Sequence, residues 1–188
     1  LVLKPLALAQ ADGDRIHGVI LGSAVRHGGR SNGLTAPNMG SQEEVIRAAL
    51  DDARIGPDAV DYLEAHGTGT PLGDPIEMAA VEAVFAASRL EAGSPLAIGS
   101  VKTNIGHLET AAGVAGIIKV LLCLRHGMLP PHLHFENPSE HIDWPSLPVT
   151  VPTEATAWPS SSPSRRRIAG VSAFGFAGTV AHVVLAGA

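Results

Sequence analysis

Cysteine, aromatic residues and charged residues are all scarce in this 188-residue chain, and each shortage excludes a class of protein. The single cysteine, Cys123, excludes an internal disulfide framework and a cysteine-based zinc site. Aromatic residues are 4% of the chain, so we expect a core of Ala, Val, Leu and Ile. Charged residues are 16% and hydrophobic ones 45%, which excludes intrinsic disorder. The net charge of −5 offers no electrostatic footprint for nucleic acid.

Long apolar runs are also missing. The longest, residues 111–124, is interrupted by Lys119 and falls short of the roughly 20 residues that a membrane span needs. The apolar start, Leu1–Ala9, is short, carries Lys4 and lacks the pattern of a cleaved secretory signal. We therefore expect a soluble, cytoplasmic protein with no membrane partner. Because the chain begins at Leu1 and not at Met, we expect it to be a piece of a larger protein.

Strand-like and helix-like patterns alternate along the chain. Short apolar runs bounded by turn formers predict strands, and apolar residues at helical spacing predict helices between them. This alternation predicts an α/β sandwich with a mixed sheet. We expect strands over Val19–Val25, Val60–Ala65, Leu96–Ser100, Ile168–Ala173 and Thr179–Leu185, and helices that begin at Ser41, Pro75 and about Thr110.

Local signals predict where two of the helices begin and end. Ser41, with Glu44 three residues later, predicts a capping box at the start of the first. Pro75 predicts the start of the second, which we expect to reach about Ala87 with a polar face at Glu77 and Glu82.

Three further segments are expected on the surface. Residues 28–33 are rich in turn formers, and Pro159–Pro163 contains three serines, so both predict loops. The basic run Arg165–Arg167 is most simply a solvated loop. The alternative is that this run docks an acidic carrier protein or a neighbouring domain.

The helix from about Thr110 to Arg125 is apolar on every side. Its stretch from residue 111 to 124 carries one charge, Lys119, which predicts a helix covered on all faces. Gly113, Ala115 and Gly116 allow a neighbouring element to approach closely. We therefore expect one face of this unit to be covered by something beyond the chain.

Two strand-to-loop ends carry a histidine among Gly and Thr residues. His66 follows the strand at 60–65, and His107 follows the strand at 96–100, five residues after Lys102. Ligand sites of α/β sheets gather at the carboxyl ends of strands, so we expect the two loops to converge. Paired neutral imidazoles with a nearby cation suit reactions in which an oxyanion develops. The hydroxyls of Thr68 and Thr70 can hold an amide-containing substrate.

Three sequence blocks make this pattern specific. They are EAHGTGTPLGDPIE over Glu64–Glu77, the block Lys102–His107, and GVSAFGFAGTVAH over Gly170–His182. Together they resemble the β-ketoacyl synthase family, most of all the ketosynthase domains of modular type I polyketide synthases. Residues Arg30–Asn38 and Leu133–Glu136 also resemble that family. The resemblance extends over nearly the whole chain and matches the C-terminal half of such a domain.

The resemblance implies a thiolase-like fold, of which this chain is the C-terminal half of an αβαβα sandwich with a mixed sheet. It implies a decarboxylative Claisen condensation between an enzyme-held acyl group and a malonyl-type extender on an acyl carrier protein. It also implies a homodimer and no cofactor bound by the chain itself, because the substrate arrives on the phosphopantetheine arm of the carrier protein.

The resemblance also implies roles for individual residues. His66 and His107 assist decarboxylation and stabilise the enolate thioester, and Lys102 supports their geometry through hydrogen bonding. Thr68 and Thr70 contact the phosphopantetheine arm. Phe176 lends its backbone N–H to an oxyanion hole and its ring to gating of the acyl pocket.

The same resemblance divides the chain into four segments. Residues 1–15 are expected to be the tail of the N-terminal ketosynthase half, and residues 16–130 the C-terminal domain with the histidines. Residues 131–167 are a proline-rich loop and linker. Residues 168–188 are a final strand pair around a glycine-rich oxyanion and gating loop.

The chain departs from the family in several places. The nucleophilic cysteine of the family belongs to the N-terminal half, and Cys123 lies in the apolar helix, where we expect a buried, structural thiol. Ala177 and Val180 stand where the family usually has Gly and Asn, so Ala177 adds a Cβ where only glycine fits easily. Arg26-His27-Gly28 also departs from the usual triplet. A non-catalytic scaffold or carrier-protein interaction module is the alternative hypothesis.

Other motifs are interpreted structurally. His132 and His134, two apart, are a weak metal-site candidate without a partner ligand in a recognisable pattern. The glycines from Gly67 to Gly73 do not have Rossmann spacing, and Asp74 opposes a phosphate. The remaining histidines are expected at the surface or in structural roles: His17, His27, His126, His132, His134, His141 and His182.

Overall fold

A six-stranded mixed sheet forms the centre of the molecule in a computed structural model, which describes residues 1–28, 37–158 and 165–188. The strand order is β1-β8-β7-β2-β3-β5. The first three strands in this order pair antiparallel, whereas β7, β2, β3 and β5 pair parallel, so the predicted mixed sheet is confirmed. The bounds are β1 (Val19–His27), β2 (Tyr62–Glu64), β3 (Leu96–Gly99), β5 (Val149–Thr150), β7 (Ile168–Phe174) and β8 (Thr179–Ala186).

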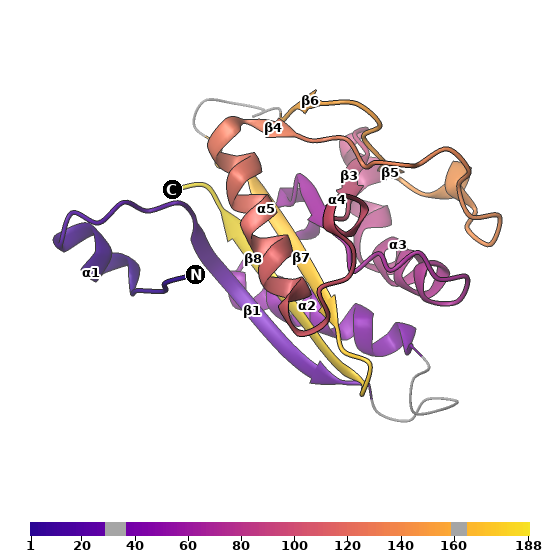
Figure 1. Cartoon of the computed structure of the whole chain (residues 1–188), viewed down its shortest axis with the longest axis horizontal. Helices are drawn as coiled ribbons and strands as arrows, with labels where there is room; N and C mark the ends of the chain where they lie inside the picture. The colour runs from indigo at the N-terminus through magenta and orange to yellow at the C-terminus, as the bar shows by residue number, and fades with distance from the viewer. Residues whose placement is uncertain (29–36, 159–164) are drawn as a thin grey trace.

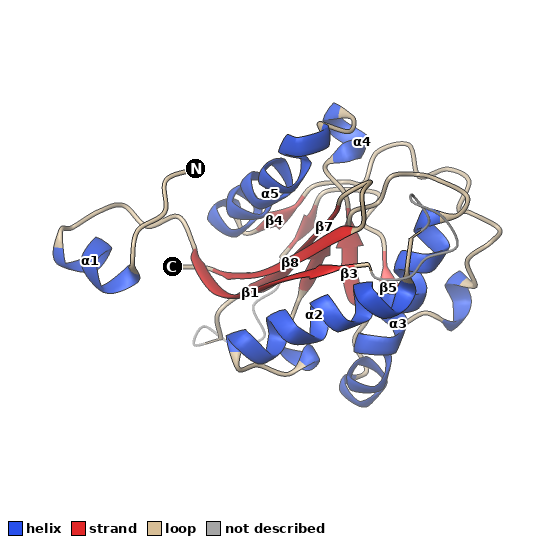
Figure 2. Cartoon of the chain, turned by 90° about the horizontal axis from the view of Figure 1, so that it is seen from below, coloured by secondary structure: helices blue, strands red, loops and turns tan. Residues whose placement is uncertain are grey.

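Helices cover both faces of this sheet. Figure 2 shows α2 (Met39–Ala53) and α3 (Gly73–Ala92) below the sheet and α5 (Ala112–His126) above it. The short helix α4 (Lys102–Ile105) joins β3 to α5, and a small ladder pairs β4 (Met128–Leu129) with β6 (Thr156–Ala157). Helix α1 (Leu6–Ala11) lies apart from the body of the molecule (Figure 1). Across the described residues, every helix is too short or too polar to span a bilayer.

Each face of the sheet has its own hydrophobic core. Beneath α2 and α3, the fully buried side chains include Ile46, Leu63 and Phe85. On the other face, α5 packs over Leu185 and over Tyr62, whose ring lies 5.7 Å from that of Trp158. Alternate residues of β2 therefore point into different cores, as expected for a strand. The last residues of this strand lead directly into the loop that carries His66.

Helix α2 begins earlier than the capping box at Ser41 predicts, so that prediction is wrong. The N-cap is Asn38, whose Oδ1 accepts a hydrogen bond from the backbone N–H of Ser41 over 3.2 Å. The Ser41 hydroxyl donates in turn to the Asn38 carbonyl. Glu44, freed from a capping role, pairs with Arg26 on β1 at 3.1 Å. Asparagine is as good an N-cap as serine, and its extended backbone here allows the role.

Helix α3 is longer than predicted at both ends. It begins at Gly73, because the Thr70 hydroxyl accepts a hydrogen bond from the Gly73 N–H over 2.9 Å. It ends at Ala92, past the predicted end near Ala87, and Gly93 follows it in the left-handed conformation. Glycine adopts that conformation without strain and commonly ends helices.

Helix α5 packs on the sheet with one side and leaves another side open. Val114, Ile118 and Leu122 are 44%, 43% and 48% exposed, and they recur every four residues on one stripe. An apolar groove of about 660 Å³ runs along this side and continues over Met128 and Pro130. The apolar stretch of α5 is therefore explained on one side by its packing on the sheet. The open stripe lies where the sequence predicts an additional cover.

Lys119, the one charged residue between residues 111 and 124, is buried in an ion pair. The Lys119 ammonium lies 2.7 Å from the Glu64 carboxylate and 2.8 Å from the Tyr62 hydroxyl, both of which belong to β2. Gly116 makes this approach possible, since a Cβ there would come within 3.1 Å of Glu64 Cγ and 3.2 Å of a Val171 methyl. Close contact at this glycine, predicted from the sequence, is confirmed.

The basic run Arg165–Arg167 is only partly solvated. Arg165 pairs with Asp61 at 3.2 Å and donates to the carbonyls of Asp58 and Ala59. Arg167 donates through Nε to the Trp158 carbonyl over 2.9 Å. The run is irregular and its first two residues are exposed, so the prediction of a solvated loop is confirmed for them, although Arg165 and Arg167 also hold the chain before β7 against the body of the fold.

Two of the predicted loops cannot be compared in full. Pro159–Pro163, and all of residues 28–33 except Gly28, lie outside the described residues. The same holds for residues 30–36 of the family-like block at Arg30–Asn38.

Gly116→Ala should destabilise the fold by about 1–3 kcal/mol, because the added methyl overpacks the contact between α5 and β2. Urea unfolding measures the change. The matched control is Gly40→Ala in α2, where the nearest atom to the new Cβ lies at an ordinary 3.4 Å. Helix propensity predicts that this control is stabilising by up to about 1 kcal/mol. Equal effects of the two substitutions would contradict the proposed packing.

Candidate active site

The two histidine loops converge at one edge of the sheet. Strands β2 and β3 run parallel, and His66 and His107 follow their carboxyl ends. The two imidazole rings lie edge to face, with centroids 5.4 Å apart and an interplanar angle of 83°. The convergence predicted from the position of these histidines after two strands is confirmed.

Backbone hydrogen bonds determine which nitrogen of each ring carries the proton. The Phe174 N–H donates to His66 Nδ1 over 3.3 Å, and the Glu109 N–H donates to His107 Nδ1 over 3.0 Å. A ring nitrogen that accepts is unprotonated, so each neutral imidazole has its proton on Nε2. The site therefore contains two imidazole N–H donors, which suits the stabilisation of an oxyanion.

The surroundings of His66 favour its neutral form. Burial lowers its pKa to about 4, and the positive charge of Lys102 adds to the effect. Burial also lowers the pKa of Lys102, against the pull of carboxylates that include Glu64, Glu77 and Asp74. Lys102 thus acts on His66 through its charge, and the expected hydrogen bonding to the histidines stays a prediction.

Glu77 holds the His66 loop from the α3 side. It is 3% exposed, and its two oxygens accept hydrogen bonds from the backbone N–H groups of His66 and Gly67 over 2.7 and 2.8 Å. Burial raises the pKa of this carboxyl to about 7, while the two N–H donors oppose the rise. The predicted polar surface at Glu77 is therefore wrong, although Glu82 on the same helix is exposed.

Glycines allow the rest of this loop to turn sharply. Gly67 and Gly69 have φ values of +46° and +72°, which other residues rarely adopt. A Cβ on Gly67 would also come within 3.0 Å of Ser100. The Gly69 N–H donates to the carboxylate of Asp74 over 3.1 Å. Two carboxylates of α3, from Asp74 and Glu77, therefore fix the backbone of the loop.

The predicted hydroxyls lie near each other on this loop. Thr68 is half-buried and Thr70 is exposed, and their Oγ1 atoms are 3.4 Å apart. The Thr70 oxygen already accepts a hydrogen bond from the start of α3.

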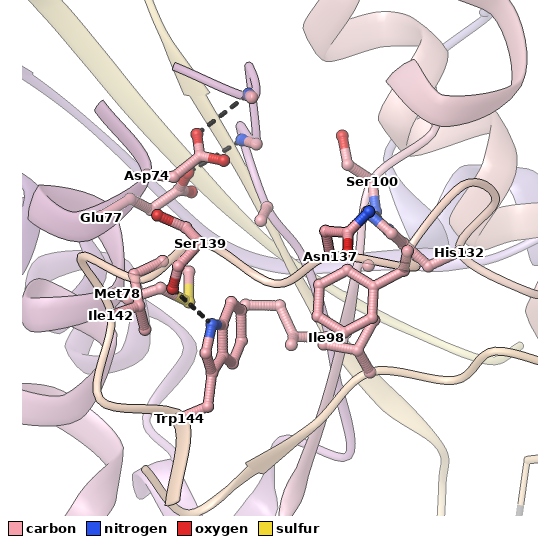
Figure 3. A pocket seen from close by; sticks show the side chains of 16 residues that line it. Asp74, Glu77, Met78, Ile98, Ser100, His132, Asn137, Ser139, Ile142 and Trp144 are labelled. Atoms are coloured by element: carbon pink, nitrogen blue, oxygen red, sulfur yellow. Dashed lines mark hydrogen bonds between the residues drawn. The ribbon is translucent and has the colours of Figure 1, made fainter. Parts of the chain in front are cut away.

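A cavity of about 270 Å³ lies beside the same loop (Figure 3). Its walls include Gly67, Glu77, Phe135 and Trp144, but neither His66 nor His107. The cavity is therefore separate from the space between the two imidazoles. Its lining comes from the segment 132–151, from α3 and from the ends of β2 and β3.

Comparison with known proteins shows the family of the chain. Residues 17–136 match the family model described as "Beta-ketoacyl synthase, C-terminal domain". The chain belongs to the β-ketoacyl synthase family. The match includes both histidine loops, Lys102 and Glu77.

Relatives of this ketosynthase domain are modular polyketide synthases. The chain is 55% identical over 184 residues to a phenolphthiocerol/phthiocerol polyketide synthase of Mycobacterium tuberculosis, spanning 98% of the chain and 10% of that protein. It is 54% identical over 185 residues to the erythronolide synthase EryA2 of Saccharopolyspora erythraea, of which it spans 5%. The chain is thus similar to a small part of each relative.

Solved ketosynthases share the fold. The ketosynthase from module 6 of the bacillaene synthase of Bacillus subtilis 168 superimposes with a TM-score of 0.91 at 44% identity. The match covers 98% of this chain and 34% of that one. The oxazolomycin ketosynthase domain of Streptomyces albus superimposes with a TM-score of 0.92 at 42% identity, over 33% of its length. The fold of the chain is therefore thiolase-like, as the sequence blocks predict.

The aromatic residue in contact with His66 is Phe174. Its ring lies 5.3 Å from the His66 ring, and its N–H sets the tautomer. Phe176, two residues on at the β7–β8 turn, is 82% exposed. Phe174 was not predicted to belong to the site. Its position at the carboxyl end of a predicted strand could have indicated that it belongs to the site, because that strand, β7, runs parallel to β2.

The departures of this ketosynthase domain from the usual glycine-rich turn are accommodated. Gly178 has a φ of +90°, whereas Ala177 is not among the described non-glycine residues with positive φ. The prediction that Ala177 occupies a glycine-only conformation is therefore wrong. Val180 is buried in the core beneath α2 and α3, where it packs as an apolar side chain.

Cys123 is a structural thiol. It is 4% exposed in the core beneath α5, and burial raises its pKa to about 11 despite the opposing charge of Lys119. A thiol in this state is not a nucleophile near neutral pH. The prediction from its place in the apolar helix is confirmed.

The remaining histidines of the ketosynthase domain have structural contacts where they are buried. His182 is fully buried, with Nδ1 3.0 Å from the Ser172 hydroxyl, and burial lowers its pKa to about 3. The His132 Nδ1 accepts a hydrogen bond from the Ser100 N–H over 3.2 Å. Within the described ranges, no group of three or more His, Cys, Asp or Glu side chains is arranged to hold a metal ion.

Glu77→Gln should destabilise the domain by about 1–3 kcal/mol, because the amide replaces one of two buried acceptors with a donor that faces a backbone N–H. Chemical unfolding measures the free energy. Glu82→Gln on the exposed side of α3 is the matched control and should change stability by less than about 0.5 kcal/mol. A Glu77 variant as mild as this control would show that the two hydrogen bonds do not hold the loop.

His66 should titrate with a midpoint near 4. Because this value lies below its ordinary 6.5, protonation favours the unfolded state. The resulting contribution to stability is present above pH 6.5 and is lost as the pH falls toward 4. Imidazole NMR shifts, assigned by comparison with His66→Ala, measure the midpoint. A midpoint at 6.5 would show that burial does not lower the pKa of His66.

Proposed function

We propose that the chain is the C-terminal part of a polyketide ketosynthase that condenses an acyl thioester with a malonyl-type extender on an acyl carrier protein. The observation that carries the proposal is the pair of imidazoles whose ring centroids lie 5.4 Å apart, each accepting a backbone hydrogen bond at Nδ1 so that Nε2 is left to donate. Membership of the β-ketoacyl synthase family supports it. The whole protein's substrates and partners follow from this proposal.

The chemistry needs what these residues offer. When the malonyl carboxylate leaves as CO₂, the electrons of the broken C–C bond form an enolate, whose charge collects on the thioester oxygen. Two N–H donors aimed at that oxygen stabilise it as it forms. Neutral donors suit the step, because a charged imidazolium would more readily protonate the carbanion. The positive charge of Lys102 favours the neutral form of His66 and stabilises the enolate.

The nucleophile comes from outside this chain in the proposal. The enolate carbon attacks the carbonyl of an acyl group held on a cysteine, the new C–C bond forms, and the cysteine thiolate leaves. Cys123 cannot serve, because it is buried with a pKa raised to about 11. The N-terminal half supplies the thiolate, and the open stripe of α5 is where that half packs.

The remaining roles belong to the substrate path. Thr68 and Thr70 contact the phosphopantetheine arm of the carrier protein, which their position at the exposed end of the loop supports. Phe176 lends its N–H to an oxyanion hole and its ring to gating of the acyl pocket, and its 82% exposure supports a ring available to a second half. The proposed enzyme is a cytoplasmic homodimer that needs no cofactor of its own.

A second candidate is a non-catalytic scaffold that binds a carrier protein or another partner. It is favoured by one observation, that the only thiol of the chain is buried and protonated. The neutral imidazole pair favours catalysis, since a scaffold has no use for it.

His66→Ala and His107→Ala, each made in the complete ketosynthase, should lower malonyl decarboxylation by about 10²–10³-fold, the usual cost of one lost oxyanion donor. Release of CO₂ from a malonyl-carrier substrate measures the step. His141→Ala, at an exposed position, is the control and should retain the wild-type rate. Unchanged rates in both loop variants would reject these roles, and a wild-type domain without activity would favour the scaffold.

A further inference from the structure

Glu64 is a buried carboxylate with partners from three different parts of the fold. It is 2% exposed at the end of β2. Its Oε2 accepts hydrogen bonds from the Tyr62 hydroxyl and the Lys119 ammonium, each over 2.7 Å. Its Oε1 accepts from the backbone N–H of Val101. Glu64 therefore links a strand, a helix and a turn, and does more than pair with the charge of Lys119.

These three parts carry the candidate active site. Glu64 precedes His66 by two residues on the same strand end. Val101 directly precedes Lys102, and the short helix α4 that begins there leads to His107. Lys119 lies on α5, which begins five residues after His107. The carboxylate therefore connects the segment of one imidazole with the segment of the other.

The surrounding packing leaves Glu64 little freedom. A Cβ on Gly116 would come within 3.1 Å of Glu64 Cγ, and the Lys119 side chain is 10% exposed. The Tyr62 hydroxyl donates a hydrogen bond to Glu64 and accepts one from Lys119. Burying an ion pair adds little net stability compared with an apolar pair of the same shape, so a buried pair is weak evidence for a stabilising role. The specific contact with the Val101 N–H offers a different reason for an acidic residue here.

We propose that Glu64 is a positioning residue, whose hydrogen bond to the Val101 N–H sets the separation of His66 and His107. For its kinetic consequence the inference rests on the proposed condensing function. Glu64 does not touch the reacting atoms, because its oxygens accept hydrogen bonds from the Lys119 ammonium and the Val101 N–H. It acts on His107 through the start of α4 and on His66 through the end of β2.

Two double variants of the complete ketosynthase test this role against a purely stabilising one. The first combines Glu64→Gln with Lys119→Met, and the second combines Glu64→Met with Lys119→Met. Both remove the two charges and keep similar side-chain volumes. They differ in one respect: glutamine retains an oxygen that accepts from the Val101 N–H, and methionine does not.

The Gln/Met variant should decarboxylate a malonyl-carrier substrate with a kcat within about threefold of wild type. The Met/Met variant should lose tenfold or more in kcat with little change in KM, because displacing one catalytic group by about 1 Å can cost up to about 10²-fold in rate. Urea unfolding of both variants separates this effect from a loss of fold. Equal kcat values in two folded variants would overturn the inference.

A structural readout keeps the test independent of the proposed function. Crystal structures of the two variants should show the 5.4 Å ring separation preserved in the Gln/Met protein and changed in the Met/Met protein. This comparison decides the positioning role even when the wild-type domain proves inactive, in which case only the proposed function fails. The same separation in both variants would overturn the inference.

Val101→Pro is the second route when the Met/Met protein does not fold. It removes the N–H donor and leaves Glu64 and Lys119 in place, and the φ of −63° at Val101 suits proline. Val101→Ala, which keeps the N–H, is its control. The inference requires a tenfold or greater loss of kcat and a changed ring separation in the proline variant alone, and equal behaviour of the two would refute it.

Discussion

The architecture depends on a negative charge placed where the fold would otherwise be apolar. The sheet and α5 meet across Glu64 and Lys119, and neither charge can be buried without the other. This requirement determines the register of the helix over the strands, because Lys119 must lie over the end of β2. Gly116 lies one turn earlier and admits the acidic side chain. Apolar packing alone would tolerate a helix that slides; a paired charge does not.

Two carboxylates from opposite layers hold the edge of the sheet where the histidine loops converge. Glu64 reaches it from the α5 side and accepts the N–H of Val101, whereas Glu77 reaches it from the α3 side and accepts those of His66 and Gly67. The histidine loops therefore have their backbones fixed by acceptors, while the imidazoles remain donors. Each carboxylate is thus directed at backbone N–H groups and not at the imidazole rings.

The sequence predicted what depends on topology and missed what depends on a single contact. The convergence of His66 and His107 was predictable, since both follow strands of one parallel set. The burial of Glu77 was not predicted, because a helical pattern assigns a glutamate to solvent and does not show that the N–H groups of His66 and Gly67 lie within reach of it. The cap at Asn38 was misjudged for a similar reason, since Ser41 and Asn38 are equally good candidates by residue type. Phe174 and the conformation of Ala177 depend on the exact path of a turn that no periodicity describes.

The open side of α5 has a consequence for the strength of the ion pair beneath it. Lys119 lines the apolar groove and keeps a tenth of its side chain accessible there. Any protein surface that fills the groove also removes water from around this ammonium, and the attraction between opposite charges grows as the local dielectric falls. Burial of this groove therefore strengthens the ion pair between Lys119 and Glu64, which lies two residues before His66.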